Sequence, residues 1–110
     1  MSLIELANTN FERGRYERAL AQYSKALEAD QGSVYARIGR ARVFIRCGRI
    51  REAADALSNS EDHSVLETID SFWLAMGEIS LSDKRSDDAE KCFRAALRVA
   101  PDSAQAIAGL

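Results

Sequence analysis

Residues 86–103 read SDDAEKCFRAALRVAPDS, and residues 15–33 hold an earlier version of the same stretch, RYERALAQYSKALEADQGS. The clearest matching pairs, each 70 positions apart, are Ala19 and Ala89, Tyr23 and Phe93, and Leu27 and Leu97. This spacing leaves room for one more copy between the two. Similarity at a fixed period is typical of proteins built from stacked structural units, so the sequence predicts an array of repeats.

The composition favours a small helical domain. The chain has 110 residues, 46% of them hydrophobic, with only six Gly and one Pro. A net charge of −2 gives no overall attraction to nucleic acid or to an anionic membrane. Arginine is concentrated in residues 34–51, which carry six Arg and no acid, whereas residues 52–110 carry twelve acids and five bases.

The last copy can be compared with a known helix-pair pattern, W-x2-L-G-x2-Y, then A-x3-F, then P. At those places it has Trp73, Met76, Gly77, Ser80, Ala89, Phe93 and Pro101, of which only Ser80 departs. The first copy has Leu3, Leu6, Ala7, Asn10, Ala19, Tyr23 and Gln31; the middle one has Arg37, Arg40, Ala41, Phe44, Ala53, Leu57 and Val65. The departures are Asn10 and Gln31 in the first, and Arg37, Arg40 and Val65 in the middle. Over nearly the whole chain, this spacing closely resembles the tetratricopeptide repeat.

The resemblance implies an all-α fold, a right-handed α-solenoid of three helix-turn-helix repeats with a short C-terminal capping helix. We expect one domain over residues 1–110, with repeats at 1–33, 34–69 and 70–103. Residues 104–110 would be a cap or a truncated fourth repeat. The helices are predicted at 2–13, 16–29, 34–47, 50–59, 65–82, 86–99 and 103–110. Capping boxes at Ser2 and Ser64, and simple N-caps at Ser86 and Ser103, are expected to begin four of them.

Two classes of side chain are expected in the core. Small residues are needed where helix backbones approach, and these are Ala7, Ala41, Gly77, Ala19, Ala53 and Ala89. Large residues fill the gaps beside them, and these are Leu6, Tyr23, Phe44, Leu57, Trp73, Met76 and Phe93. Gly14 and Gly48 are placed where a helix ends in a left-handed residue. Lys84 has the same place in the third repeat, which predicts a looser turn there.

No group of residues in the sequence predicts catalysis, a metal site or a cofactor. His63 is the only histidine, and the paired acids Glu61-Asp62 and Asp87-Asp88 lie at expected helix ends. Cys47 and Cys92 are isolated and lie on periodic apolar stretches, so we expect two buried thiols in a reducing compartment, the cytoplasm. No secretion signal is visible, and no apolar run would insert into a membrane. The start at Met1 and a helix-like end at Leu110 indicate a piece of a longer protein.

The resemblance also implies a binding face, because the first helix of each repeat lines the concave side. The residues expected on this face are Ile4, Asn8, Phe11, Tyr35, Ile38, Arg42, Ile45, Arg46, Leu74, Glu78 and Leu81. They form two apolar rows with a polar row between them, suited to a peptide whose acids meet Arg42 and Arg46. Chaperone-tail binding is not expected, because the clamp residues of such repeats are replaced by Ile4, Gly39, Ser71 and Ala75, with only Asn8 in agreement.

The sequence therefore predicts a non-catalytic protein–protein interaction module that binds a partner segment in a concave groove. The alternative is a structural repeat array that packs within a larger protein or associates as a homodimer. Nucleic acid is not an expected partner, because the arginines are spread around a helix with few aromatic residues among them and the third repeat is acidic.

Overall fold

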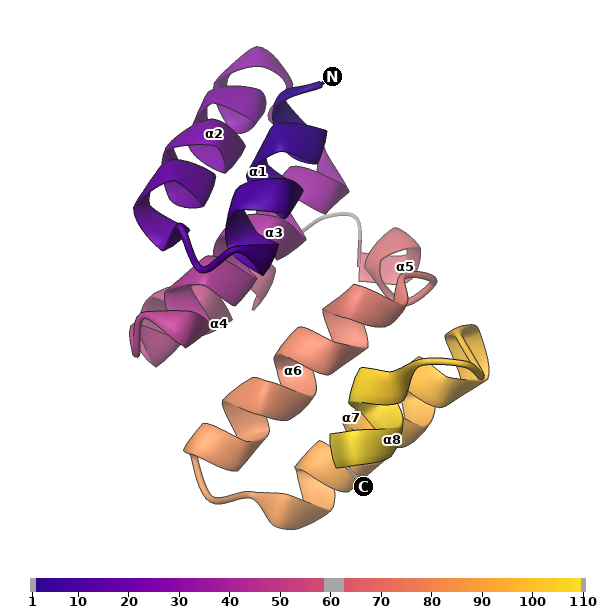
Figure 1. Cartoon of the computed structure of the whole chain (residues 1–110). Coiled ribbons are helices and arrows are strands. Elements are labelled where there is room, and N and C mark those ends of the chain that lie inside the picture. Colours follow the sequence, from indigo (N-terminus) through magenta and orange to yellow (C-terminus); the bar gives the residue numbers. More distant parts are fainter. Residues whose placement is uncertain (1, 59–62, 110) are drawn as a thin grey trace. The chain divides into compact units, whose positions relative to one another are not determined.

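The structure is a computed structural model that describes residues 2–58 and 63–109. In these two ranges every regular element is an α-helix, as predicted (Figure 1). The helices are α1 (Leu3–Glu12), α2 (Tyr16–Ala29), α3 (Val34–Arg46), α4 (Ile50–Ser58), α5 (His63–Leu66), α6 (Asp70–Ser82), α7 (Ser86–Val99) and α8 (Ala104–Gly109). Across the described ranges, no helix combines the length and apolar character needed to span a membrane.

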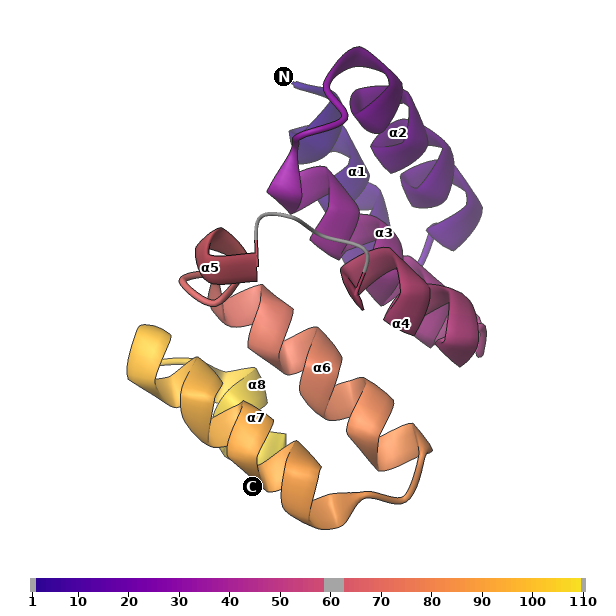
Figure 2. The ribbon, with the colours of Figure 1, turned by 180° about the vertical axis from the view of Figure 1, so that it is seen from behind.

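The chain divides into two compact units, residues 1–59 and 60–110, which are described separately, and the single domain expected from the sequence stays a prediction. In unit 1, α2 packs against both α1 and α3, and α4 packs against α3. In unit 2, α6 and α7 form an antiparallel pair, and α8 contacts both of them. Figure 2 shows both arrangements from behind. Each unit is thus made of helices that are covered by their neighbours in the chain.

The small residues lie where the backbones approach, as predicted. Ala7, Ala19, Ala41 and Ala53 are 0% exposed and Ala89 is 1% exposed. Gly77 is also buried, and a Cβ built there would come 2.8 Å from the ring of Phe93. A larger side chain at such a position would have to displace a packed ring or helix.

The large residues follow the prediction in part. Tyr23, Phe44, Leu57 and Phe93 are at most 4% exposed, and Trp73 and Met76 are half-buried. Leu6 was expected in the core and is 37% exposed, so that prediction is wrong. Leu6 lies on α1, and within the described chain no earlier helix covers the outer side of α1.

The turn at Lys84 is as well formed as the two glycine turns. Gly14, Gly48 and Lys84 all have positive φ angles, of 76°, 79° and 60°. Each repeat makes the same pair of backbone bonds after its first helix, including Arg15 N–H to Asn10 O and Arg85 N–H to Ser80 O, both 2.8 Å. The predicted looser turn at Lys84 is therefore wrong. The backbone bonds of the helix end hold a lysine in the conformation that glycine adopts more readily.

Serine caps two helices as predicted, and it caps a third helix, α3, for which no cap was predicted. The Glu5 N–H donates to Ser2 Oγ at 3.1 Å, and the Ala106 N–H donates to Ser103 Oγ at 3.2 Å. Ser33 caps α3 in the same way, accepting from the Ala36 N–H at 3.3 Å. The N-cap predicted at Ser86 is wrong, because Ser86 is already helical and the N-cap residue, Arg85, makes no side-chain hydrogen bond that caps α7.

The long helix predicted at 65–82 is wrong, because the chain breaks between α5 and α6. Ile69 has extended backbone angles, φ −112° and ψ 119°. The Thr68 hydroxyl donates to Val65 O at 2.6 Å, and Trp73 Nε1 donates to Glu67 O at 2.9 Å. These side chains satisfy carbonyls that an unbroken helix would use internally. The α5 helix begins at His63, so Ser64 lies inside it and is not its N-cap. Residues 59–62, which include the end of the helix predicted at 50–59, lie outside the described residues.

Candidate functional site

The aromatic ring of Phe11 is the centre of the first-helix face in unit 1. Phe11 lies near the end of α1, and α3 packs beside it. The guanidinium carbon of Arg42 lies 5.0 Å from the centre of the Phe11 ring, and that of Arg46 lies 5.5 Å from it. The electron-rich face of an aromatic ring attracts such cations by about 0.5–1 kcal/mol at exposed sites. The predicted residues Phe11, Arg42 and Arg46 are therefore brought together.

Asn8 lies one helical turn before Phe11 and is held by a buried tyrosine. The Tyr23 hydroxyl, from α2, donates to Asn8 Oδ1. Tyr23 is 2% exposed, and burial raises its pKa to about 12, with Glu12 adding to the rise and Arg42 opposing it. Because the oxygen of Asn8 accepts this bond, its amide N–H groups are the donors that the exposed side chain retains.

The remaining predicted residues of unit 1 differ in how much surface they offer. Tyr35 is 60% exposed, and Ile4 and Ile45 are half-buried. Ile38 is only 2% exposed, which corrects its expected place on the face. A side chain so deeply buried belongs to the interior and has almost no area to give to a ligand.

In unit 2, one of the three predicted residues is also part of the core. Leu74 is 4% exposed and packs in a cluster with Ala89, Phe93 and Ala96, so it offers no surface to a partner. Glu78 is half-buried, and Leu81 is 49% exposed. The continuation of the predicted rows from one unit to the next stays a prediction.

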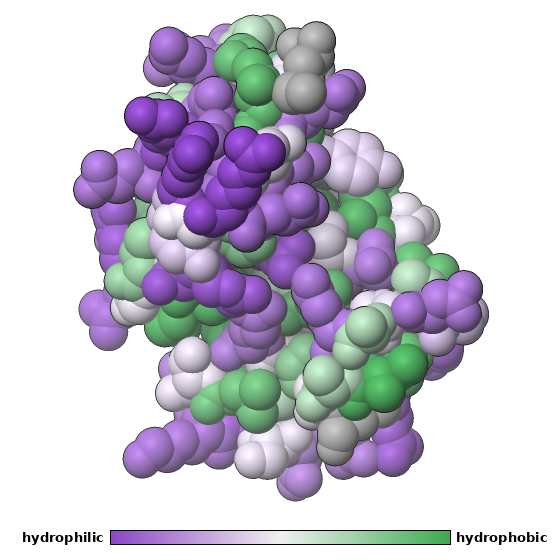
Figure 3. Space-filling model, viewed as in Figure 1, coloured by the Kyte–Doolittle hydropathy of each residue, from purple (hydrophilic) through white to green (hydrophobic). Residues whose placement is uncertain are grey.

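On the side seen in Figure 3, hydrophilic side chains gather over α1 and α2, and apolar atoms lie over α8. Exposed apolar residues of unit 2 include Ile107, at 58%, and Val99, at 40%. In unit 1, the guanidinium groups of Arg42 and Arg46 beside Phe11 suit contacts made through charge as well as through apolar area.

The two cysteines differ from the prediction of buried thiols. Both are free, Cys47 is exposed at the end of α3, and Cys92 on α7 is half-buried. Burial raises the pKa of the Cys92 thiol, and the nearby Asp88 raises it further. The exposure of Cys47 corrects that prediction, and the cytoplasmic location that rested on it stays a prediction.

Gly39 explains in structural terms why one clamp position of chaperone-binding repeats is absent. It lies on α3 against the ring of Tyr23, and a Cβ built on Gly39 would overlap that ring. An asparagine at this position would therefore require Tyr23 to move. At position 39, α3 therefore packs directly against Tyr23 of α2.

Comparisons with known proteins agree with this geometry. Two family models described as tetratricopeptide repeat match residues 10–61 and 70–103. No curated protein matches the chain in sequence.

Solved structures show the same fold at low identity. The Arabidopsis OM64 TPR domain has a TM-score of 0.80 at 19% identity, covering 97% of this chain and 87% of that one. The first TPR domain of human RPAP3 has a TM-score of 0.78 at 20% identity, covering 96% and 82%. The second TPR domain of human RPAP3, in complex with an HSP70 peptide, has 0.73 at 22%, covering 99% and 89%. This chain belongs to the tetratricopeptide repeat family, a family of non-catalytic protein-interaction modules.

Proposed function

We propose that this chain is a non-catalytic protein–protein interaction module that binds a segment of a partner protein on the first-helix face of unit 1. The observation that carries the proposal is the Phe11 ring with the guanidinium groups of Arg42 and Arg46 5.0 Å and 5.5 Å from its centre. Such a site combines an apolar surface with two positive charges. It suits a peptide that presents an apolar side chain next to an acidic one.

The contacts in unit 1 can be assigned from this geometry. An apolar side chain of the partner would rest on Phe11 and Ile45, both half-buried and therefore partly accessible. An acidic side chain would meet Arg42 or Arg46, and the amide of Asn8 would donate to the peptide backbone. Glu78 and Leu81 of unit 2 remain proposed contacts, since neither is buried.

Similar structures support a peptide as the class of ligand. The first TPR of Spaghetti is bound to an HSP90 peptide, with a TM-score of 0.77 at 20% identity, covering 96% of this chain and 82% of that one. For this chain we propose a different partner, because Ile4, Gly39, Ser71 and Ala75 stand where a chaperone-tail clamp needs Lys, Asn or Arg.

A comparison of two charge-reversal variants tests the proposal. Arg42→Glu/Arg46→Glu changes the face, whereas Arg18→Glu/Arg51→Glu makes the same change in charge at two exposed arginines of α2 and α4. Wild type and both variants are immobilised, and proteins captured from a cell extract are quantified by mass spectrometry. We expect partners that wild type and the control variant share to be lost from the face variant. Equal capture by all of them would show that the face is wrongly assigned.

The alternative function, a structural array that self-associates, is favoured by one observation. Leu81 lies near the end of α6 and is 49% exposed, so about half of its apolar side chain is available to pack against a second copy. If this function holds, sedimentation will show concentration-dependent association that Ile45→Glu or Leu81→Glu abolishes. A monomer at all concentrations would favour the interaction module.

A further inference from the structure

The middle repeat carries two arginines where the other repeats carry apolar residues. Arg37 and Arg40 on α3 take the positions of Leu3 and Leu6 in the first repeat. In the third repeat, the same positions hold Trp73 and Met76. The substitution is paired and confined to one repeat, so it changes the chemistry of one place in the fold.

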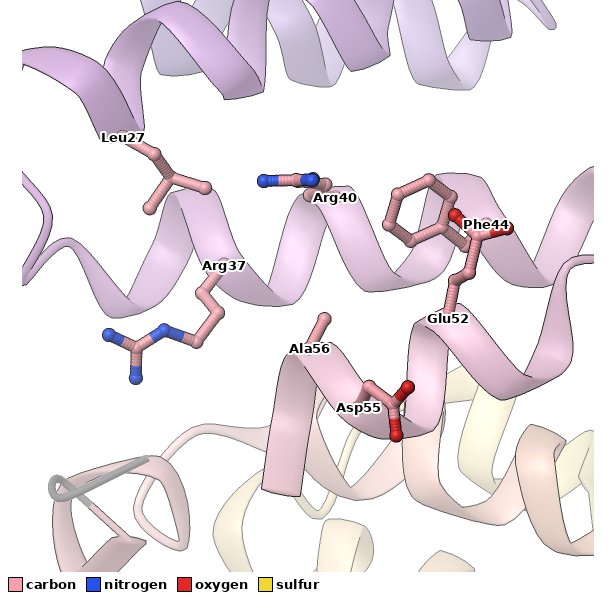
Figure 4. A pocket seen from close by; sticks show the side chains of 7 residues that line it. All are labelled: Leu27, Arg37, Arg40, Phe44, Glu52, Asp55 and Ala56. Carbon is pink, nitrogen blue, oxygen red and sulfur yellow. The ribbon is translucent and has the colours of Figure 1, made fainter. Parts of the chain in front are cut away.

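The two arginines line a cavity of about 370 Å³ that lies wholly within unit 1. Its walls come from α2, α3 and α4 and are formed by Leu27, Arg37, Arg40, Phe44, Glu52, Asp55 and Ala56. Figure 4 shows the Arg40 guanidinium pointing along α3 toward Leu27, with Ala56 across from it. The α2–α3 side of the cavity therefore carries the two arginines with Leu27 and Phe44, and the α4 side carries Ala56 with Glu52 and Asp55.

The guanidinium group of Arg40 has no anionic partner among the described residues. Within the described ranges, Arg40 makes no hydrogen bond or ion pair, and its Nε is buried without a partner. Its guanidinium carbon lies 5.4 Å from the centre of the Phe44 ring. A buried guanidinium N–H without an acceptor is destabilising. A ligand cannot reach the buried Nε, but a carboxylate that accepts from the terminal nitrogens would give the positive charge of Arg40 an anionic partner.

One of the two acids in the cavity wall is already engaged with another arginine. Glu52 accepts from Arg49 Nε at 2.7 Å and from Arg49 Nη2 at 2.5 Å. Arg49 also lies 4.8 Å from the centre of the Phe44 ring, so two guanidinium groups share that ring. The pairing with Arg49 offsets the charge of Glu52, so the two arginines of the wall outnumber the one remaining acid, Asp55.

We propose that this cavity binds an acidic side chain, Asp or Glu, of a partner peptide. The carboxylate would accept from the terminal nitrogens of Arg40, and its short stem would contact Leu27, Phe44 and Ala56. A single carboxylate fits better than a phosphate, because Asp55 in the wall would repel a second negative charge. A stem of one or two methylene groups also suits the apolar side chains of the wall.

This site is separate from the face around Phe11. At about 100° per residue, Arg37, Arg40 and Phe44 fall on one side of α3. Arg42, Ile45 and Arg46 fall on a different side, in keeping with the contacts of Arg42 and Arg46 with Phe11 on α1. Failure of one site can thus be told from failure of the other.

The test is an NMR titration with two short probes, acetyl-Ala-Glu-Ala-amide and its neutral counterpart acetyl-Ala-Gln-Ala-amide. Amide shifts of the 15N-labelled full chain are followed up to about 10 mM probe, the weak range expected for one ion pair. We expect the Glu probe to shift residues around Arg40 and Ala56 and to bind about tenfold more tightly than the Gln probe. Added salt should weaken the Glu probe alone.

Variants separate the proposed contact from general effects. Arg40→Leu introduces the residue found at the matching position of the first repeat and should lose binding of the Glu probe. Arg40→Lys keeps the charge without the planar fork and should retain part of it. Arg51→Leu, which removes an exposed arginine of α4 outside both sites, should bind like wild type.

Three results would each overturn the proposal. They are equal binding of the Glu and Gln probes, no binding of either at the highest concentration, and unchanged binding by a folded Arg40→Leu chain. Thermal melting by circular dichroism reports whether Arg40→Leu folds. If it does not, unchanged binding by Arg40→Gln overturns the proposal instead, because the amide keeps a polar side chain without the charge.

Discussion

Gly39 lies so close to Tyr23 that a Cβ at position 39 would overlap the tyrosine ring. The same relationship recurs 70 residues later, where a Cβ at Gly109 would come 2.7 Å from the ring of Phe93. In each case the first helix of a pair rests on the aromatic residue of the helix before it. α8 therefore packs on α7 as α3 packs on α2, in the manner of the first helix of a further repeat.

This contact predicts that Gly39→Ala destabilises the protein. The added methyl group forces Tyr23 from its buried position, and overpacking of this kind costs about 1–3 kcal/mol. Urea unfolding followed by circular dichroism measures the free energy of unfolding. Gly32→Ala is the matched control, because the nearest atom to its Cβ would be Asp30 Oδ1 at an ordinary 3.4 Å.

The overlap can also be relieved from the other side. In Gly39→Ala/Tyr23→Leu, the smaller side chain makes room for the methyl group, so the two changes should cost less together than the sum of each alone. Strict additivity in this cycle would show that Tyr23 is not what excludes a side chain at position 39.

Tyr23 itself predicts a loss of stability at high pH. An unfolded tyrosine ionises near pH 10, whereas burial raises the pKa of Tyr23 to about 12 in the folded chain. Between these values the unfolded state loses its proton first, so the free energy of unfolding falls as the pH rises from about 10 to about 12. Tyr23→Phe should remove this component.

Near neutral pH, Tyr23→Phe should instead cost about 0.5–1.5 kcal/mol, because it removes the bond to Asn8. The difference between wild type and variant therefore shrinks as the pH is raised. Tyr35→Phe is the control, since Tyr35 is 60% exposed and should change neither value. Parallel stability curves for wild type and Tyr23→Phe above pH 10 would contradict the assigned pKa.

The fold could be predicted where it depends on backbone approach. Ala7, Ala41 and Gly77 recur at the repeat period, and close packing of two helices permits only small residues there, so sequence and structure agree. The break at Ile69 could not be predicted in this way. It depends on Trp73 donating to Glu67 O, a bond between residues six apart that no helix periodicity contains.

The sequence predicted which side of each helix forms the binding face, but not how deeply each residue on that side is buried. Helix period places Phe11 and Arg42 on facing helices, and the structure brings them to 5.0 Å. The same rule placed Ile38 and Leu74 on the face, yet they are 2% and 4% exposed. A periodicity states which side a residue is on, whereas burial depends on which elements cover that side.

The two thiols predict a difference in reactivity. Cys47 is exposed, while Cys92 is half-buried and has a pKa raised by burial and by Asp88. The thiolate is the reactive form, so near pH 8 Cys47 should be alkylated several times faster than Cys92. Mass spectrometry of Cys47→Ser and Cys92→Ser, each with one thiol left, measures the two rates. Equal rates in the folded state would contradict the burial of Cys92.

Lys84 predicts a stabilising substitution. It holds the place of Gly14 and Gly48 with a φ of 60°, a conformation in which a side chain meets its own backbone. Lys84→Gly removes that strain but also loosens the unfolded chain, so the net gain should be about 0.5–1 kcal/mol. Lys91→Gly is the control, because Lys91 lies inside α7 and glycine there should cost about 1 kcal/mol.

The reverse change tests the same kind of turn in the middle repeat. Gly48→Lys gives the middle repeat the residue that the third repeat already tolerates, so the chain should still fold and lose about 1 kcal/mol. If the same backbone bonds form, amide hydrogen exchange at Arg49, whose N–H donates to Phe44 O at 2.8 Å, will remain protected. Unprotected exchange at Arg49 would mean that glycine, and not the pattern of backbone bonds, is what holds the turn.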